Sequence, residues 1–521
     1  MIRRLICFNS LAVALLAVFF LIYPCVRAMS DLLDPALQKP GIPKLVWRLY
    51  RNVTPRYAVW AKERVAAGRA ATLSTSDISG TEWPLFGSVF YLWGIENLQA
   101  AWDAGDHSAG VEPKVFAKEA IVAASELVID PNHASWVKKH WGVNYLHREN
   151  VFYRMLVIAA LTSREKLLHE GARLDLLRDQ VETFAKELDA SGTGLLDDYP
   201  GQCYPGDVMA ALMCIRRADA VLGTDHSEFI KRAVRGFIGT RATRHQLPPY
   251  AASSEAGTPL SESRGCANSY MCLTAPELWP ARARQWYEQY DRFFWQQRFT
   301  AVGYREFPVG VAHSDWTMDV DAGPVIAGHG VAACAFGIGA ARKNGRFDRA
   351  YPLSAELLVT VGELPDGVLA GPRLLSNLSD APMLGEAAIL WLLSIQPEAG
   401  FAVKSGGSIP TFVYVVLICV LLLGVGCILK ATRTFRAALR PPGPAVPALK
   451  LQLAAWALLM LAALIASSSG HALIGILVFI VGVMLPVTGR NRKPDEFEDW
   501  PEAKSAPAAA PTPADKPKTD R

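Results

Sequence analysis

Residues 174–190, LDLLRDQVETFAKELDA, show the pattern that decides the fold of this chain. Their apolar side chains recur every three or four positions and therefore lie on one face of an α-helix. The Ser-Gly-Thr-Gly sequence that follows favours a helix end near Ala190. Because the same spacing recurs on both sides of this segment, we predict an all-α domain.

Other segments share this helical spacing: residues 115–129, 149–163, 208–223, 282–299 and 385–395. Alternation typical of strands is scarce, and in Leu222-Gly223-Thr224-Asp225 we expect Gly to end one helix and Thr or Asp to cap the next. No fixed-length repeat is visible, which counts against an open repeat array. We therefore predict about ten to twelve helices in an (α/α)6 barrel, with helical pairs around a central pocket.

The N-terminal part of the chain is strongly apolar. Residues 5–23 carry no charge and follow Arg3 and Arg4, so they can span a bilayer or act as a signal sequence. The small-residue cleavage signal is poor, and we expect an uncleaved transmembrane anchor over residues 1–29. Either alternative exports the segment that follows, residues 30–408.

The C-terminal part carries further apolar runs. We predict a transmembrane helix over 409–429, a basic cytoplasmic loop over 430–450 and a membrane hairpin over 451–487, with an interfacial hairpin as the alternative. The Ala- and Pro-rich tail, 488–521, is expected to be disordered. Because basic clusters favour the cytoplasmic side, we expect a bacterial inner-membrane protein with both termini in the cytoplasm and the large domain in the periplasm.

Composition excludes several classes of protein. An apolar fraction of 51% and a charged fraction of 20% exclude a disordered chain. The net charge of +4 comes mostly from the basic clusters beside the apolar runs and gives no case for nucleic-acid binding. There is no phosphate-binding loop and no zinc-spaced pair of cysteines, so we expect no metal site.

The first candidate site is the loop 197–207, which gathers carboxylates, phenols, an amide and a thiol between two helices. An acid placed near a base is what proton-transfer chemistry needs. We expect Asp198 and Cys203 to be catalytic and four neighbours to bind substrate: Tyr199, Gln202, Tyr204 and Asp207. The alternative is a structural turn in which Asp207 caps the helix beginning at Val208 and the tyrosines pack.

The second candidate is the pair Asp319 and Asp321, in a segment, 319–324, that we expect to lead directly into a helix of small residues. In an extended approach both carboxylates lie on one side of the chain. Two neighbouring carboxyls can split their pKa values into an acid and a base. The alternative is that Asp321 caps the helix and Asp319 pairs with an arginine such as Arg305.

Further candidates are Glu82, as a catalytic acid, and Glu149 with Asn150, as substrate-binding residues. Either Glu can instead favour the first turn of its helix. The spacing of Cys266 and Cys272 permits a disulfide in an oxidising compartment. Cys203 is the expected free thiol because it lies in the polar loop.

The order and spacing of these motifs resemble the linalool dehydratase/isomerase family over most of residues 80 to 400. The resemblance rests on Arg148-Glu149-Asn150, Asp197-Asp198-Tyr199-Pro-Gly-Gln202-Cys203, Leu222-Gly223-Thr224-Asp225 and Asp319-Val-Asp321-Ala-Gly323. It implies an (α/α)6 barrel with a cofactor-free lyase and isomerase site for a tertiary or allylic terpene alcohol.

By that resemblance, Cys203 lines up with an active-site cysteine of the family, flanked by Tyr199 and Gln202. Glu82 takes the place of an acidic residue. Two positions depart from the family pattern, because its second cysteine falls near Gly194 and its histidine near Leu156.

The leading hypothesis is an extracytoplasmic hydro-lyase or isomerase that acts on a small, hydrophobic alcohol by acid/base catalysis, without metal or organic cofactor. Glu82 or Asp198 suits the proton donor, and Asp319, Asp321 or Cys203 suits the acceptor. The alternatives are a carbohydrate-active barrel, of glycoside hydrolase or polysaccharide lyase type, and a non-catalytic binding module of the cell envelope. Self-association is left open. Convergence of the two candidate loops on one cavity would favour an enzyme.

Overall fold

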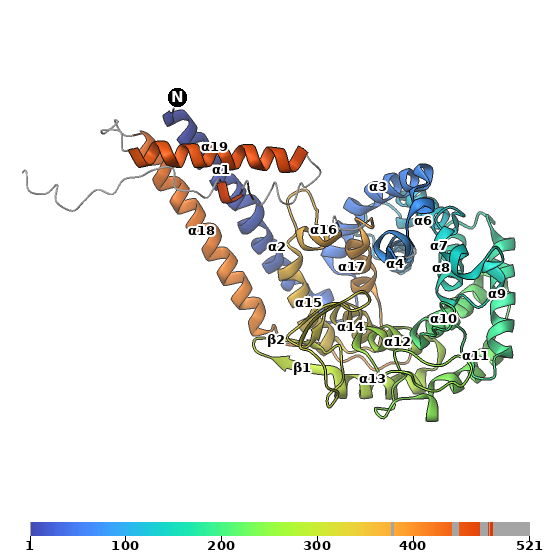
Figure 1. Cartoon of the computed structure of the whole chain (residues 1–521). Coiled ribbons are helices and arrows are strands. Elements are labelled where there is room, and N and C mark those ends of the chain that lie inside the picture. The colour runs from blue at the N-terminus through green and yellow to red at the C-terminus, as the bar shows by residue number, and fades with distance from the viewer. Residues whose placement is uncertain are drawn as a thin grey trace, which may run out of the picture. The chain divides into compact units, whose positions relative to one another are not determined.

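The computed structural model describes most of the chain: residues 2–74, 76–376, 380–439, 447–468, 478 and 480–482. Within these residues the fold is mostly helical, with 19 α-helices and a few short strands (Figure 1). The prediction of a mainly helical chain is confirmed.

The helices before residue 200 are α1 (Ile2–Ala17), α2 (Tyr23–Leu32), α3 (Lys44–Ala67), α4 (Ile78–Asp103), α5 (Pro113–Phe116), α6 (Lys118–Ile129), α7 (Ser135–Trp141), α8 (Val151–Leu168) and α9 (Leu174–Ala190). The later helices are α10 (Pro205–Leu222), α11 (Ser227–Ala233), α12 (Gly265–Leu278), α13 (Pro280–Phe294), α14 (Val331–Lys343), α15 (Phe347–Val361), α16 (Ala370–Ser376), α17 (Leu384–Ser394), α18 (Thr411–Leu439) and α19 (Pro447–Ser468). The strands are β1 (Trp295–Arg298), β2 (Ala301–Tyr304), β3 (Trp316–Asp319), β4 (Gly323–Ile326) and β5 (His329–Gly330).

The helix ends follow local sequence signals. Helix α9 covers the predicted segment and ends at Ala190, and Gly223 ends α10 in the left-handed conformation with φ 69°. Of the two caps expected after Gly223, Thr224 is wrong, because its hydroxyl donates to Asp219. The Asp225 carboxylate does accept from the N–H of Ser227, the first residue of α11, at 2.9 Å. Local hydrogen bonding of a threonine side chain competes with capping.

Six helices contact one another in the order α4, α8, α10, α12, α14, α17 and back to α4, and we call them the core helices. Helices α3, α6, α9, α13 and α15 each pack against one or more of them (Figure 1). Aromatic side chains fill part of the space between the core helices: Phe90 stacks on Trp391 at a centroid distance of 4.9 Å, and Phe336 lies 5.9 Å from Phe90. Such close packing of large apolar rings supplies much of the hydrophobic stabilisation.

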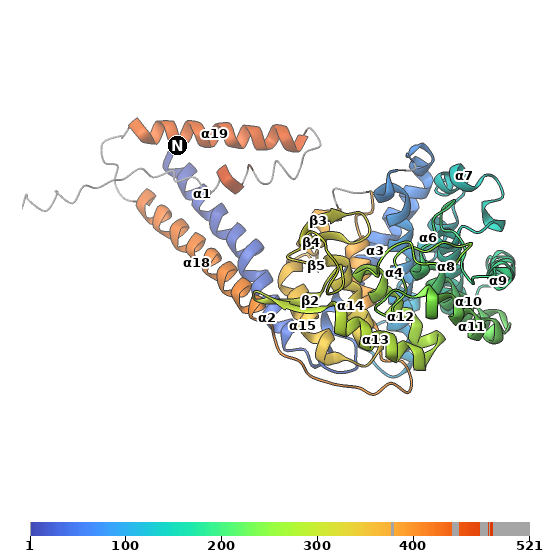
Figure 2. The same cartoon turned by 60° about the horizontal axis from the view of Figure 1, so that its bottom comes forward.

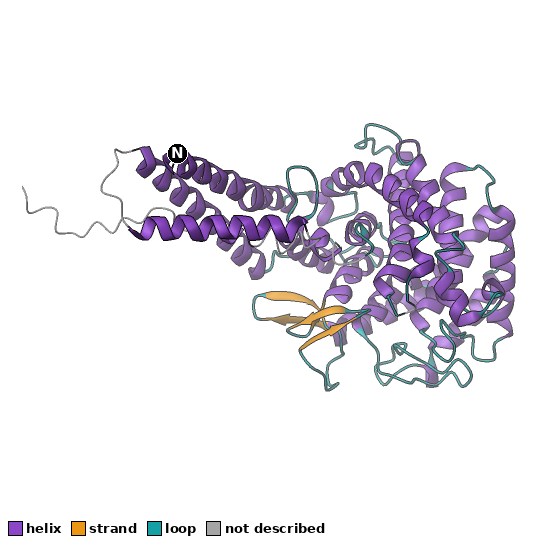
Figure 3. Ribbon diagram, turned by 45° about the horizontal axis from the view of Figure 1, so that its top comes forward, coloured by secondary structure: helices purple, strands orange, loops and turns teal. Residues whose placement is uncertain are grey.

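The segment between α13 and α14 differs from the prediction. Helix α13 ends at Phe294, and β1 pairs with β2 in an antiparallel ribbon. Strands β3, β4 and β5 form a second antiparallel sheet, shown in orange in Figure 3. Asp319 and Asp321 therefore lie at the tip of the β3–β4 hairpin, and the expectation that they lead directly into a helix is wrong, because α14 begins only at Val331.

Two helical segments are long and apolar enough to cross a membrane by length and composition: Ile6–Leu32, in which a π-helical turn joins α1 to α2, and Thr411–Leu439. The start of the expected basic loop is wrong, because Lys430, Arg433 and Arg436 continue helix α18. Helix α19 occupies the first half of the expected hairpin. Nearly all of the second half, and the whole tail 488–521, lie outside the described residues.

The chain divides into two compact units, residues 14–429 and residues 1–13 with 430–521. In the larger unit the two apolar segments contact each other, since the Cys25 thiol donates to the Leu417 carbonyl at 3.6 Å. Gly424 permits this approach, because a Cβ there would lie 2.6 Å from the Ile22 side chain. Within this unit the sheets and the core helices form one body with the first part of α18 (Figure 2).

Candidate active site

The loop before α10 is held by backbone contacts to carboxylates. The Asp197 N–H donates to Glu149 at 2.7 Å, and the Gly201 N–H donates to Asp197 at 2.6 Å. Gly201 has φ 77°, which suits a turn between Tyr199 and Gln202. Glu149 therefore shapes the loop. It precedes α8, so a place in the first turn of that helix is wrong.

Asn150 also has a structural position. It is buried, adopts the left-handed conformation before α8, and its side-chain amide donates to the Tyr145 carbonyl at 3.0 Å. This hydrogen bond holds the Asn150 side chain against the short 3₁₀ turn before it. The expectation that Asn150 binds substrate has no support from its geometry.

Asp198 is fully buried below this loop. One carboxylate oxygen accepts from the Tyr204 N–H at 2.7 Å, and the other has no hydrogen-bond partner among the described residues. Burial, and then the charge of Asp207, raise the pKa of Asp198 well above its usual value. Burial therefore favours the protonated form of this carboxyl.

Glu82, in the first turns of α4, accepts a hydrogen bond from the Tyr199 hydroxyl. Burial raises the pKa of Glu82 to about 7. The hydrogen bond from Tyr199 opposes this rise, and the charge of Asp321 adds to it. Asp207 lies in the first turn of α10, and burial together with the charges of Asp321 and Glu82 raises its pKa to about 8. The N-cap of α10 is Tyr204, so the capping alternative for Asp207 is wrong.

Asp321 joins the same group through a tyrosine. The Tyr250 hydroxyl donates to Asp321, and the Tyr250 ring lies 5.2 Å from the Tyr204 ring. Because Asp321 also raises the pKa of both Glu82 and Asp207, these carboxyls lie within electrostatic reach of one another. We call Glu82, Asp198, Asp207 and Asp321 the acidic cluster. It brings together the two candidate loops.

Asp319 has a different environment from Asp321. Its carboxylate accepts from the backbone N–H groups of Asp321 and Ala322 at 2.9 and 3.0 Å and pairs with Arg264 at 3.1 Å. Although burial opposes them, these contacts hold the pKa of Asp319 below its usual value. Asp319 therefore stays ionised and shapes the hairpin tip. The alternative in which Asp319 pairs with an arginine is confirmed, although the arginine is Arg264 and not Arg305.

Arg264 links the hairpin tip to a buried carboxyl, since its second contact is with Glu306 at 2.7 Å. The Cys266 thiol donates to the same carboxyl at 3.1 Å. Gly265 lets the backbone carbonyl of Arg305 lie close to the start of α12, because a Cβ at residue 265 would lie 2.0 Å from that carbonyl. Cys266 and Cys272 are both free thiols, so the disulfide that their spacing permits is not formed.

Cys203 is 1% exposed. Burial, and then the charge of Asp198 and its neighbours, raise the pKa of the Cys203 thiol. The thiol therefore stays protonated near neutral pH, which removes Cys203 from the candidates for a proton acceptor. Gln202 is exposed and its side-chain oxygen accepts from the Tyr204 hydroxyl at 3.1 Å.

Aromatic side chains adjoin the acidic cluster. The Tyr270 ring lies 5.4 Å from Phe336, and the Phe86 ring lies 5.4 Å from Phe90. The Tyr270 hydroxyl is buried without a hydrogen-bond partner among the described residues, and burial, Cys214 and Asp207 raise its pKa. Rings beside carboxyls suit a ligand with an apolar body and one polar group.

Sequence reasoning missed Tyr250, Arg264, Cys266 and Tyr270. A signal for Tyr250 and Arg264 is the long segment before α12, whose proline, glycine and aromatic content is too elaborate for a spacer; Cys266 and Tyr270 lie in the first turns of α12 itself. At the two positions that depart from the family pattern, Leu156 is fully buried in α8 and Gly194 lies in a turn with φ 73°. Neither can supply a proton-transfer group.

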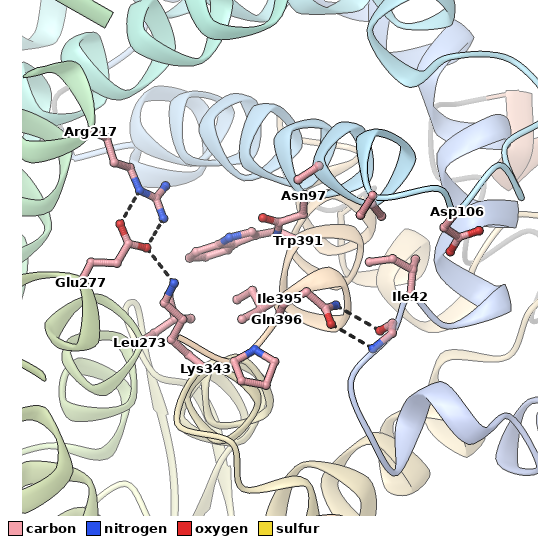
Figure 4. Close-up of a pocket in the computed structure, with 15 residues that line it drawn as sticks. Ile42, Asn97, Asp106, Arg217, Leu273, Glu277, Lys343, Trp391, Ile395 and Gln396 are labelled. Carbon is pink, nitrogen blue, oxygen red and sulfur yellow. Dashed lines mark hydrogen bonds and ion pairs between the residues drawn. The ribbon is translucent and has the colours of Figure 1, made fainter. Parts of the chain in front are cut away.

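A cavity of about 410 Å³ lies at the opposite ends of the core helices (Figure 4). Its walls include Trp391 and Asn97, and its charged side is an ion-paired triad in which Glu277 lies between Arg217 and Lys343, at 2.6 and 2.9 Å. None of the predicted site residues lines this cavity.

In the described part of the chain, no group of three or more His, Cys, Asp or Glu side chains is arranged to hold a metal ion. No model of a known protein family and no curated protein matches the chain. Kinship with the linalool dehydratase/isomerase family therefore stays a prediction.

Proposed function

We propose that the chain is a membrane-anchored acid/base lyase or isomerase, similar to linalool dehydratase/isomerase, that acts on a small hydrophobic alcohol. The observation that carries this proposal is the acidic cluster, in which Glu82, Asp207 and Asp321 come from three distant segments. The charge of Asp321 raises the pKa of both Glu82 and Asp207, and the charge of Glu82 adds to the rise at Asp207. Carboxyls whose environments differ can divide the roles of acid and base.

The proposed fold is an (α/α)6 barrel. The closed order of contacts among the core helices supports it, since each of the six packs against two others of the set. The intervening helices α3, α6, α9, α13 and α15 pack against core helices and fit an outer layer. The acidic cluster then occupies the rim where α4, α10 and α12 begin, so loops far apart in sequence come together at that rim.

In the proposed reaction, Glu82 donates its proton to the substrate hydroxyl, because a carboxyl with a pKa of about 7 is protonated below neutral pH. The carbon–oxygen bond breaks and water leaves with both bonding electrons. Asp321 removes a proton from the adjacent carbon, whose C–H electrons form the alkene. The proton gained by Asp321 returns to Glu82 through the cluster, and the reverse sequence gives hydration or isomerisation.

The phenols have positioning roles. Tyr199 donates to Glu82, and Tyr250 donates to Asp321, so each hydroxyl fixes one oxygen of its carboxyl and leaves the other oxygen for substrate. Arg264 holds Asp319, and thereby the hairpin tip, in place. This arrangement keeps donor and acceptor oriented before substrate enters.

The membrane part of the proposal rests on the two apolar segments Ile6–Leu32 and Thr411–Leu439. Arg3 and Arg4 precede the first segment, and Arg433 and Arg436 end the second. The excess of basic residues at these ends favours the cytoplasmic side, which puts the large domain in the periplasm.

The test uses the purified full chain and two panels, terpenoid alcohols and oligosaccharides. Glu82→Gln and Asp321→Asn should each lower turnover of an alcohol about 10²- to 10⁴-fold. Asp189→Asn, in an exposed pair with Arg232, is the matched control and should keep full turnover. Thermal unfolding of the same samples separates a lost proton-transfer group from a lost fold. Consumption of oligosaccharides alone, or full turnover by Asp321→Asn, would refute the assignment.

A further inference from the structure

The β3–β4 hairpin has an apolar outer face. Trp316 lies opposite Ile326 and Met318 lies opposite Pro324 in the antiparallel register, so these four side chains share one face of the ribbon. Trp316 is 67% exposed and Met318 is 75% exposed. Val320 at the tip is also exposed, and no charged side chain shares this face of the paired strands.

Part of the other face of the hairpin packs on the domain, through Val325 of β4, although Thr317 opposite it is exposed. Val325 is buried with Cys266 and Ala322, in a small apolar cluster beside Ala332. An antiparallel ribbon with one face on the core normally presents polar side chains to water on the other face. Here the pattern is reversed, so the outer face is suited to an apolar environment.

The hairpin is tied to the point where α18 begins. The Phe412 N–H donates to the Thr300 carbonyl at 2.8 Å, which joins the β1–β2 turn to the first turn of the helix. Arg298 of β1 pairs with Asp315, just before β3, at 2.7 Å. It also donates to the carbonyl of Ala327, just after β4, at 3.2 Å, so it holds both ends of the β3–β4 hairpin. Figure 1 shows β1 and β2 beside this end of α18.

The β1–β2 turn itself carries Phe299, which is 81% exposed beside the start of this apolar helix. Aromatic side chains gather at membrane interfaces, where an apolar ring meets the headgroup region. A second copy of the chain could also cover an apolar face. The backbone bond between Phe412 and Thr300 favours lipid, because it holds the turn at the level where the chain enters the bilayer.

We propose that the outer face of the β3–β4 hairpin, together with Phe299, inserts into the lipid surface next to α18. The hairpin tip carries Asp319 and Asp321, so this contact opens the acidic cluster toward the bilayer. The substrate is then an alcohol dissolved in the membrane. The lipid contact rests on the membrane anchor of the proposed function, and the substrate class rests on its acid/base site.

The experiment measures tryptophan fluorescence of the full chain in vesicles of phosphatidylcholine brominated near the headgroup end of its acyl chains. The contribution of Trp316 is the difference between the native chain and Trp316→Phe. We expect bromolipid to quench most of this difference signal and water-soluble iodide to quench little of it. The matched control is Trp102→Phe, whose partly exposed indole lies at the far end of α4. It should be insensitive to bromolipid.

A Trp316 signal quenched by iodide and not by bromolipid would overturn the proposal. So would a signal protected from both quenchers when cross-linking joins two copies through the hairpin. Because quenching requires no turnover, a failed activity screen with a quenched Trp316 refutes only the proposed chemistry. An active enzyme with an unquenched Trp316 refutes only the lipid contact.

Discussion

The two ends of the core helices each contain a partly buried glutamate, and the pKa values of the two shift in opposite directions. Glu82 lies near Asp207 and Asp321, and its pKa rises to about 7. Glu277 is at least as buried, but the contacts to Arg217 and Lys343 outweigh that burial and hold its pKa far below the usual value (Figure 4). Burial alone therefore does not decide protonation. The presence of cations within ion-pair distance does.

The helix N-termini at this end favour ionised carboxylates and so oppose the rise in pKa. Helix N-termini stabilise anions by about 0.3–1 kcal/mol, and Asp207 lies in the first turn of α10, whereas Glu82 lies in the second turn of α4. That contribution is smaller than the cost of burying several carboxylates without a cation among them. The acidic cluster therefore favours protonated carboxyls, whereas the triad favours an ionised one.

The largest effect should come from breaking the triad. Glu277→Gln leaves the partly buried Arg217 without its carboxylate and should lower the free energy of unfolding by about 3 kcal/mol. Urea denaturation of the full chain in detergent measures this loss. Glu398→Gln, which removes the second and more exposed partner of Lys343, is the control and should cost about 1 kcal/mol or less. Equal losses in both variants would contradict the contrast.

The acidic cluster should make stability depend on pH. Because the folded-state pKa of Glu82 is raised, its stabilising contribution is complete below the unfolded pKa and is lost as pH rises through about 7. The free energy of unfolding should fall by roughly 3 kcal/mol from this residue alone between pH 5 and pH 9. Glu82→Gln should flatten the curve, and an unchanged slope would show that Glu82 is already ionised. Glu277 contributes no slope in this range, because its lowered pKa acts only in acid.

Turnover should follow the same ionisation. With a protonated Glu82 as donor, turnover should decline about tenfold per pH unit above pH 7. A pH profile of turnover under saturating substrate measures this limb. Glu82→Asp should retain a limb at a different pH, whereas a profile that rises above pH 7 would assign the donor role elsewhere.

The smallest effect should come from the phenol next to Asp321. Tyr250→Phe removes one hydrogen bond to a carboxylate and should lower the free energy of unfolding by about 1 kcal/mol, with a larger loss of turnover. Tyr204→Phe is the matched control for stability, because its hydroxyl contacts the exposed Gln202 side chain and its loss should change the free energy of unfolding little. Thermal unfolding and turnover are measured on both variants. If Tyr250→Phe changes neither stability nor turnover, Tyr250 does not position Asp321.

Local patterns predicted the elements that repeat over several turns. Leu174–Ala190 forms α9 as its apolar spacing indicates, and the two long apolar runs form helices of membrane-spanning length. The β3–β4 hairpin was missed because its strands are four residues long and Trp316, Thr317 and Met318 are all exposed, so no alternation between buried and exposed positions marks them. Gly323 and Gly328 gave turn signals without a strand pattern.

The sequence by itself determined the helical class, the apolar segments and the two loops rich in proton-transfer groups, because these depend on residues close together along the chain. Which carboxyl groups lie near one another, and which pair with an arginine or lysine, depends on the tertiary structure. Asp321 reaches Tyr250 across 71 positions and Tyr199 reaches Glu82 across 117, whereas Asp319 receives Arg264. A pKa depends on charges within a few ångströms in space, and packing of the core helices brings those charges together.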